Sequence, residues 1–148
     1  MIDLLREAAD LQARRGSPHW TEADFSLDDH RAVMRAGELF VAARGGEILA
    51  SLRLQRADPA LWPDDPPGQA LYLHKVAVSR LVGGQGWLAR LVAWSGVRAL
   101  RAGAAYLRLD TLPETPLPNL YARLGFAPVD ARPVEHGGLR LVRMQKRL

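Results

Sequence analysis

A cluster of glycines between a strand-like and a helix-like segment is the clearest candidate binding site in the sequence. Gly83, Gly84 and Gly86 follow an apolar run that ends at Val78, and Gln85 stands between the last two glycines. Glycine has no Cβ, so the backbone can turn tightly there and can approach a ligand closely. The helix that follows begins with unpaired N–H groups and the positive end of its dipole. The pattern predicts a seat for a phosphate or pyrophosphate group.

The residues around the turn narrow the type of phosphate ligand. The loop that binds nucleoside triphosphates needs a lysine at its end, and neither lysine of the chain lies there. A dinucleotide site stays open, because Gly84-x-Gly86-x-x-Ala89 fits the pattern G-x-G-x-x-A and Asp110 ends the following strand. A dinucleotide-binding fold, however, places this pattern in its first strand–helix–strand unit and continues with several more. Here a hairpin precedes the turn and little chain follows it.

Composition excludes other chemistries and partners. The 148 residues contain no cysteine, which excludes a thiolate nucleophile and a disulfide framework. The histidines lack the spacing of metal ligands, so no metal is expected. No apolar run is long enough to cross a membrane and the N-terminus lacks a signal core, so a cytoplasmic protein without membrane contact is expected. The net charge of +4 comes from scattered basic residues, and nucleic-acid binding is not expected.

The elements that must position these residues are helices and strands in alternation. Helical spacing and caps predict helices over Asp3–Arg15, from the cap Ser26 to Gly37, over Gln85–Ala102 and over about Asn119–Leu124. Strands are predicted over Leu39–Ala43, Glu47–Gln55, Leu71–Val78, Ala104–Thr111, Phe126–Val129 and Leu139–Lys146. Gly45 and Gly46 predict a tight hairpin between the first two strands.

Single side chains on these elements carry further expectations. Alternation places His74 on one strand face with Tyr72, Val76 and Val78. Leu91 and Trp94 are expected to pack against the sheet from the long helix, with Trp87 nearer to a ligand. The stretch Ala57–Gln69 contains four prolines, so it is predicted to be irregular, with Trp62 as a loop anchor.

The element order predicts the fold class. The strand Leu71–Val78, the helix after it and the strand Ala104–Thr111 form a βαβ unit, whose strands should be parallel because such crossovers are right-handed. The other connections favour antiparallel pairs. We therefore predict an α+β fold in a single domain over residues 1–148. Its central sheet is mixed and mostly antiparallel, with a parallel βαβ core flanked by helices.

Two motifs resemble those of the GNAT superfamily of acyl-CoA N-acyltransferases. The segment VAVSRLVGGQGWLARLV, from Val76 to Val92, resembles the family's coenzyme A loop, and LYARLGF, from Leu120 to Phe126, resembles its second hallmark. The element order is similar over nearly the whole chain, although the family's usual first strand is short or missing. Gly83 stands where the family usually has Arg or Gln, and Leu88 where it usually has Gly or Ala.

The resemblance implies an N-acetyltransferase that uses acetyl-CoA as its co-substrate. By this resemblance, the strands Leu71–Val78 and Ala104–Thr111 of this chain would separate at their carboxyl ends, and the pantetheine arm of the cofactor would enter between them. The implied cofactor-binding residues are Val76, Ala77, Val78, Gly83, Gly84, Gln85, Gly86, Trp87, Leu88 and Tyr121.

The resemblance also implies the proton chemistry. The amine attacks the thioester directly, and Tyr121 is the implied acid for the departing thiolate. His74 is the candidate base, with Asp110 and Glu114 as weaker candidates.

The sequence says less about the amine substrate and about the oligomeric state. The acceptor would be a small-molecule or peptide amine, in a pocket built by Ser17–Gly37 and Ala57–Gln69. A homodimer through Phe126–Leu148 is possible. The alternatives are a non-catalytic acyl-CoA-binding or regulatory module on the same fold and, less favoured, a dinucleotide-binding protein.

Overall fold

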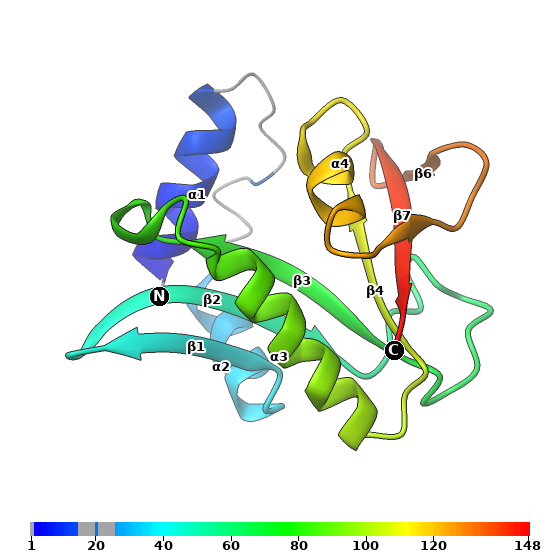
Figure 1. The fold of residues 1–148 in the computed structure, drawn as a ribbon, viewed down its shortest axis with the longest axis horizontal. Coiled ribbons are helices and arrows are strands. Elements are labelled where there is room, and N and C mark those ends of the chain that lie inside the picture. Colours follow the sequence, from blue (N-terminus) through cyan, green and yellow to red (C-terminus); the bar gives the residue numbers. More distant parts are fainter. Residues whose placement is uncertain (1, 15–19, 21–25) are drawn as a thin grey trace. The chain divides into compact units, whose positions relative to one another are not determined.

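The computed structural model describes residues 2–14, 20 and 26–148, and its elements follow the predicted order. The helices are α1 Ile2–Arg14, α2 Leu27–Arg35, α3 Trp87–Arg101 and α4 Leu117–Ala122, with a short 3-10 turn, η2, over Arg80–Val82 (Figure 1). The strands are β1 Leu39–Arg44, β2 Glu47–Gln55, β3 Ala70–Val78, β4 Tyr106–Thr111, β5 Ala127–Pro128, β6 Val134–His136 and β7 Leu139–Arg147. Among the described residues these strands form a mixed sheet in the order β1-β2-β3-β4-β7-β5, and β6 pairs with β7. No helix in these ranges has the length and apolar character that crossing a bilayer requires.

The chain divides into two compact units. The first consists of Met1–Leu54 and Lys75–Arg90, and the second of Gln55–His74 and Leu91–Leu148. β3 and α3 therefore each contribute residues to both units. The single-domain organisation expected from the sequence stays a prediction.

The first unit is formed by α1, α2, the β1–β2 hairpin and the carboxyl end of β3. Ser26 caps α2 as predicted, with its Oγ 3.5 Å from the Asp29 amide. Gly45 and Gly46 both have positive φ, 59° and 83°, which is the conformation that a two-residue hairpin loop with matching twist requires. The core packs Leu4, Leu5 and Ala77 against Ile2, Ala8, Ala9, Trp20 and Ile48.

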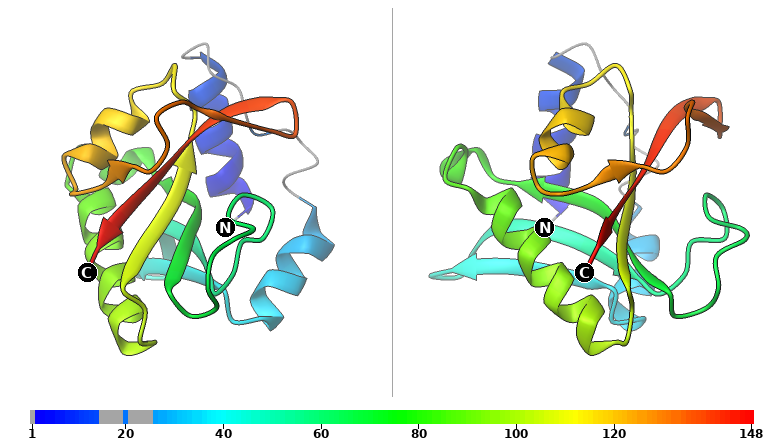
Figure 2. Two further views of the ribbon diagram at one scale, coloured as in Figure 1. Left: turned by 90° about the vertical axis from the view of Figure 1, so that its right-hand side faces the viewer. Right: turned by 45° about the vertical axis from the view of Figure 1, so that its right-hand side comes forward.

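The second unit is organised around β4. Six residue pairs join β4 to β7 in antiparallel register, from Tyr106↔Arg147 to Thr111↔Val142 (Figure 2). On its other edge β4 pairs with β3 in parallel, from Ala70↔Tyr106 to Tyr72↔Arg108. The parallel arrangement predicted for the βαβ unit is confirmed.

Three features depart from the sequence predictions. The structure adds β6 and η2, which are short elements without a periodic pattern. The prediction that Trp94 packs against the sheet is wrong, because this side chain is 40% exposed and lies 5.6 Å from the Arg98 guanidinium. A period of 3.6 puts Trp94 at the flank of the buried stripe of α3, which consists of Leu91, Val92, Ser95, Gly96 and Ala99.

Candidate active site

The predicted phosphate turn lies in the first unit, between β3 and α3. The Ser79 amide donates to the Leu49 carbonyl at 2.8 Å, which ties the start of the turn to β2. After η2, Gly84 and Gly86 adopt φ of 73° and 74°, in the left-handed region that glycine enters without strain. The Gly86 carbonyl accepts from the Arg90 amide at 3.2 Å, so α3 begins directly after this glycine. The first amides of α3 therefore point into the turn.

The surroundings of the glycines show which of them leave room for a ligand. A Cβ added at Gly84 or Gly86 would meet no heavy atom of the described structure within 4 Å. A Cβ at Gly83 would lie 3.3 Å from the Arg80 carbonyl oxygen, so a larger residue would press on η2 there. This tight fit is a physical reason for glycine where the family usually has Arg or Gln. The open side of the turn is the side of Gly84 and Gly86.

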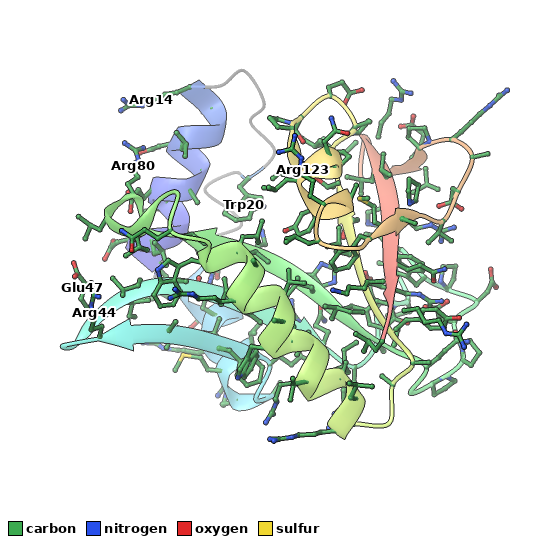
Figure 3. The ribbon with its side chains drawn as sticks, in the orientation of Figure 1. Arg14, Trp20, Arg44, Glu47, Arg80 and Arg123 are labelled. Atoms are coloured by element: carbon green, nitrogen blue, oxygen red, sulfur yellow. The ribbon has the colours of Figure 1, made fainter. Side chains whose placement is uncertain are left out.

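The turn is also held from α1. Nε of Arg80 lies 3.3 Å from Oε1 of Glu7, and the Arg80 amide is the same distance from that oxygen. Figure 3 shows Arg80 beside α1. Part of the guanidinium charge is thereby offset by a carboxylate. The backbone of the turn and the amides of α3 supply the remaining attraction for an anion.

β3 is irregular just before the residues predicted to meet the pantetheine arm. Lys75 has φ of 48°, a left-handed conformation that costs an L-residue about 1–2 kcal/mol. The alternation of side chains between the two faces of the strand therefore stops at Lys75. Contrary to the sequence prediction, His74 does not share a strand face with Val76 and Val78. Ala77 is buried in the core of the first unit, while Val76 and Val78 are half-buried.

The second unit holds Tyr121 at the end of the short helix α4. Its ring is 7% exposed and meets the edge of Phe126 at 5.6 Å between centroids. Burial, and after it the charge of Asp110, raise the pKa of Tyr121 far above its ordinary value. The hydroxyl therefore keeps its proton at every physiological pH and is available as a hydrogen-bond donor.

The same unit places His74 between two carboxylates. Nε2 of His74 lies 3.3 Å from Oδ2 of Asp58, and Nδ1 lies 3.5 Å from Oδ1 of Asp110. The side chains are 20% exposed for His74 and Asp110 and 10% for Asp58. Although burial acts to raise it, the facing imidazole holds the pKa of Asp58 below its ordinary value. His74 and Asp110 were candidates from the sequence, whereas Asp58 was missed.

The proline-rich loop that supplies Asp58 is fixed to the second unit by its other side chains. Trp62 is 5% exposed, and the guanidinium carbons of Arg108 and Arg143 lie 4.7 and 4.9 Å from its ring centroid. Asp65 is paired with Arg108 and accepts from the Tyr72 hydroxyl at 2.5 Å. Burial and this acceptor raise the pKa of Tyr72 to about 12. The prediction that Trp62 anchors an irregular loop is confirmed.

His74 and the two carboxylates that face it are also a possible set of ligands for a metal ion. Asp58, His74 and Asp110 each offer one ligand atom, and these atoms lie within 4.8 Å of one another. A metal takes the lone pair of one ring nitrogen, with its other ligands gathered on that side. Here each carboxylate faces a different nitrogen, which is the arrangement of a proton-carrying imidazole. The expectation that the protein uses no metal stays a prediction.

The other sequence candidates are more peripheral. Glu114 is exposed and lies 3.4 Å from Arg140, so it takes part in a surface ion pair. The residues predicted to bind the cofactor, from Val76 to Leu88, belong to the first unit, whereas Tyr121, His74 and Asp110 belong to the second. Of the segment Ser17–Gly37, residues 17–19 and 21–25 lie outside the described residues.

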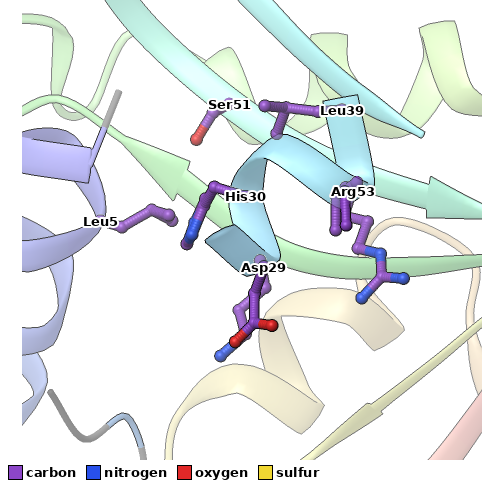
Figure 4. A pocket seen from close by; sticks show the side chains of 9 residues that line it. Leu5, Asp29, His30, Leu39, Ser51 and Arg53 are labelled. Atoms are coloured by element: carbon purple, nitrogen blue, oxygen red, sulfur yellow. The ribbon is translucent and has the colours of Figure 1, made fainter. Parts of the chain in front are cut away.

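The first unit contains a cavity of about 370 Å³ that fits part of the predicted acceptor pocket (Figure 4). The side chains around it come from α1, α2, β1, β2 and β3: Leu5, Asp29, His30, Ala32, Val33, Leu39, Ser51, Arg53 and Lys75. Arg53 forms an ion pair with Glu38, in which Nη2 lies 2.8 Å from Oε2. Among the described residues, the buried Ser51 hydroxyl has no hydrogen-bond partner. A bound polar group would satisfy it.

The ion pair beside the loop gives the fold a dependence on pH. Arg143 contacts both oxygens of Asp130, at 2.7 and 2.6 Å, and thereby lowers the pKa of Asp130 below 3.8. A carboxylate with a lowered pKa stabilises the fold above its unfolded pKa and loses that contribution as the pH falls through its folded pKa. We expect Asp130→Asn to reduce the free energy of unfolding by about 1 kcal/mol at neutral pH.

Denaturant unfolding at several pH values measures this prediction. The difference between wild type and Asp130→Asn should shrink towards zero as the pH falls through the lowered pKa of Asp130, where the wild-type carboxylate is protonated as well. Asp10→Asn, at an exposed acid of α1, is the control and should change stability little. An unchanged difference across the whole pH range would contradict the assignment.

Comparisons with known proteins identify the family and the fold. The model of the Acetyltransferase (GNAT) family matches residues 5–126. The uncharacterized N-acetyltransferase YesJ of Bacillus subtilis is 32% identical over 130 residues, which are 83% of this chain and 72% of that protein. A GNAT family acetyltransferase from Listeria monocytogenes has a similar structure, with a TM-score of 0.78 and 21% identity over 99% of this chain and 86% of its own. Another, from Elizabethkingia anophelis with acetyl-CoA bound, has a TM-score of 0.63 and 19% identity over 84% and 85% of the two chains.

Proposed function

Given that the chain belongs to the GNAT acetyltransferase family and is therefore an acyl-CoA-dependent N-acetyltransferase, we propose that it moves the acetyl group of acetyl-CoA to a primary amine of a small molecule or peptide. The amine attacks the thioester carbonyl directly, so a C–N bond forms and the C–S bond breaks. The single observation that carries the proposal is the open glycine turn at the start of α3. Its left-handed glycines, with free space in front of them, suit close contact with a pyrophosphate.

The proposed binding residues follow the turn and the strand before it. Amides from Gly83 to Leu88, with the side chains of Gln85 and Trp87 beside them, hold the pyrophosphate. Backbone groups of Val76, Ala77 and Val78 bind the pantetheine arm in the manner of an added strand. Support for the second contact comes from the parallel ladder of β3 with β4, whose last pair among the described residues is Tyr72↔Arg108. We propose that the edge of β3 opposite β2 binds, beyond that pair, a ligand that brings its own amides.

Two proton transfers complete the proposed reaction. The Tyr121 hydroxyl donates to the sulfur as negative charge develops on it, and its raised pKa keeps the donor protonated until then. His74 is the final acceptor of the proton that the amine loses. The cavity in the first unit is the proposed seat for the body of the acceptor. Its lining combines apolar side chains with charged and polar ones, and the Ser51 hydroxyl offers a polar contact.

A thermal-shift comparison tests the choice of cofactor. A ligand that binds only the folded state raises the melting temperature, and at 100 times its Kd the stabilisation is about 2.7 kcal/mol. We expect acetyl-CoA and CoA to raise the melting temperature and NAD to leave it unchanged. Stabilisation by NAD alone would overturn the proposal in favour of a dinucleotide site.

A second experiment separates catalysis from binding alone. Release of the CoA thiol is followed with a panel of amines that includes polyamines, aminoglycosides, amino acids and peptides. We expect one class to accelerate thiol release. Binding of acetyl-CoA without transfer to any amine would support a non-catalytic acyl-CoA-binding module. The predicted homodimer is checked by sedimentation of the same preparation.

A further inference from the structure

We infer that Asp58, His74 and Asp110 form a proton relay in which Asp110 takes the proton of the amine and Asp58 fixes the imidazole behind it. The inference rests on the proposed function, in which His74 is the final acceptor of that proton. It makes Asp110 the catalytic residue that meets the amine, keeps His74 as the group that stores the proton, and adds Asp58 as a positioning residue. Of the proline-rich loop, the relay uses only Asp58.

The geometry around the ring decides the direction of the relay. Both imidazole nitrogens face carboxylates, at 3.3 Å from Asp58 and 3.5 Å from Asp110. An amine therefore cannot reach a lone pair of His74 while both contacts hold. The proton has to pass through one of the two carboxylates.

Burial selects Asp110 as the carboxylate that meets the amine. Oδ2 of Asp58 and Nε2 of His74 are buried and, within the described part of the chain, lack a well-formed hydrogen bond. The side chain of Asp110 is 20% exposed, twice as much as that of Asp58. Asp110 contacts His74, and its charge also contributes, after burial, to the raised pKa of Tyr121, so this carboxylate interacts with both the proposed base and the proposed acid.

Asp58 fixes the tautomer that the relay needs. A neutral imidazole has one N–H and one lone pair. The carboxylate of Asp58 has a lowered pKa and faces Nε2, which favours the proton on Nε2 and leaves the lone pair on Nδ1 towards Asp110. Asp110 can then accept a proton from the amine on one oxygen and pass a proton from the carboxyl group to Nδ1. The resulting imidazolium has a carboxylate at each N–H.

Proton balance closes within these residues. The amine loses one proton as its C–N bond forms, and Tyr121 gives one to the sulfur as the C–S bond breaks. The proton stored on His74 can return through Asp110 to the tyrosinate, whose raised pKa makes it a strong base. No metal or redox partner is needed for this cycle.

The loop contacts explain how an irregular segment can hold a carboxylate in place. Arg143 donates to the Leu61 carbonyl at 2.7 Å, and the Trp62 amide donates to the Asp58 carbonyl at 2.8 Å. Oδ1 of Asp58 accepts from the Leu61 amide at 3.3 Å, which leaves Oδ2 directed at His74. Each oxygen of Asp58 therefore has its own contact, and together the two contacts fix the orientation of the carboxylate.

The test compares three variants that remove one charge each without changing shape. Asp110→Asn is expected to lower kcat about 30-fold and Asp58→Asn about 10-fold, with the KM for acetyl-CoA unchanged. The smaller loss for Asp58 follows because it acts through the imidazole. Asp64→Asn, at an exposed acid in the same loop, is the matched control and should keep wild-type kcat.

A second readout keeps the test independent of turnover. Nitrogen-15 NMR of the His74 ring reports which nitrogen carries the proton. Asp58→Asn should shift the Nε2 resonance, and Asp64→Asn should not. An unmoved Nε2 resonance, or full activity in both Asp58→Asn and Asp110→Asn while Tyr121→Phe is impaired, would overturn the relay and leave the acetyltransferase intact.

Two further results of these experiments would lead to different conclusions. Loss of activity on EDTA treatment, with recovery on adding a divalent cation, would replace the relay by a metal site at these residues. Failure of the wild type to acetylate any amine would remove the proposed function. The NMR arm would still show whether Asp58 fixes the ring.

Discussion

Replacing Tyr121 by Phe is expected to lower kcat for acetyl transfer about 100- to 1000-fold, with the KM for acetyl-CoA changed less than about twofold. The variant removes one hydroxyl from a ring that is 7% exposed and packed against Phe126. Phenylalanine fills the same space, so the packing of α4 stays intact. What is lost is the donor to the sulfur, which matters only as the C–S bond breaks.

Steady-state kinetics with saturating amine measure this prediction, and Tyr106→Phe is its control. Tyr106 lies in the same unit and is half-buried, but its ring contacts the Arg108 guanidinium at 5.1 Å and has no proposed role. We expect Tyr106→Phe to keep kcat within about threefold of the wild type, the size of an ordinary indirect effect. Equal activity of Tyr121→Phe and wild type would remove Tyr121 from the mechanism.

Replacing Gly86 by Asp is expected to weaken the binding of CoA at least about 100-fold. The free energy of unfolding should fall by only about 1–2 kcal/mol, the cost of an L-residue at a φ of 74°. Asp is among the residues that tolerate positive φ, and the Gly86 Cβ would meet open space. A carboxylate at the start of α3 also interacts favourably with the helix dipole. The same carboxylate would repel a pyrophosphate and occupy its space, which removes charge-assisted hydrogen bonds of about 1.5–3 kcal/mol each.

Isothermal titration with CoA gives the affinity, and Gly46→Asp supplies the matched control. Gly46 also has positive φ and open space, but it lies at the tip of the β1–β2 hairpin. Both variants add the same charge to the first unit. The account of the turn fails if Gly46→Asp weakens binding as much as Gly86→Asp, or if Gly86→Asp binds CoA like the wild type.

The parts of the fold that depend on short-range patterns could be predicted from the sequence. The hairpin at Gly45 and Gly46, the cap at Ser26 and the turn at Gly84 and Gly86 each follow from a local backbone requirement. The parallel pairing of β3 and β4 follows from the handedness of a crossover. These features need no knowledge of distant residues.

The parts that depend on long-range contacts could not be predicted. Asp58 reaches His74 only because Trp62 and Asp65 fix the loop between them on arginines about 40 to 80 residues away in sequence. No local pattern marks that aspartate. Lys75 adopts a left-handed conformation that its residue type does not favour, so alternation was a poor guide to the end of β3.

The proline-rich loop has a consequence for engineering the protein. Irregular, polar surface loops are the usual places to insert a peptide tag or a fluorescent probe, and composition alone would choose residues 57–69. Trp62, however, is buried against two guanidinium groups, and the aspartates before and after it in the sequence, Asp58 and Asp65, pair with His74 and Arg108. An insertion there would displace a buried indole. The hairpin tip between Arg44 and Glu47 offers a better site for insertion, because all four of its residues are exposed (Figure 3).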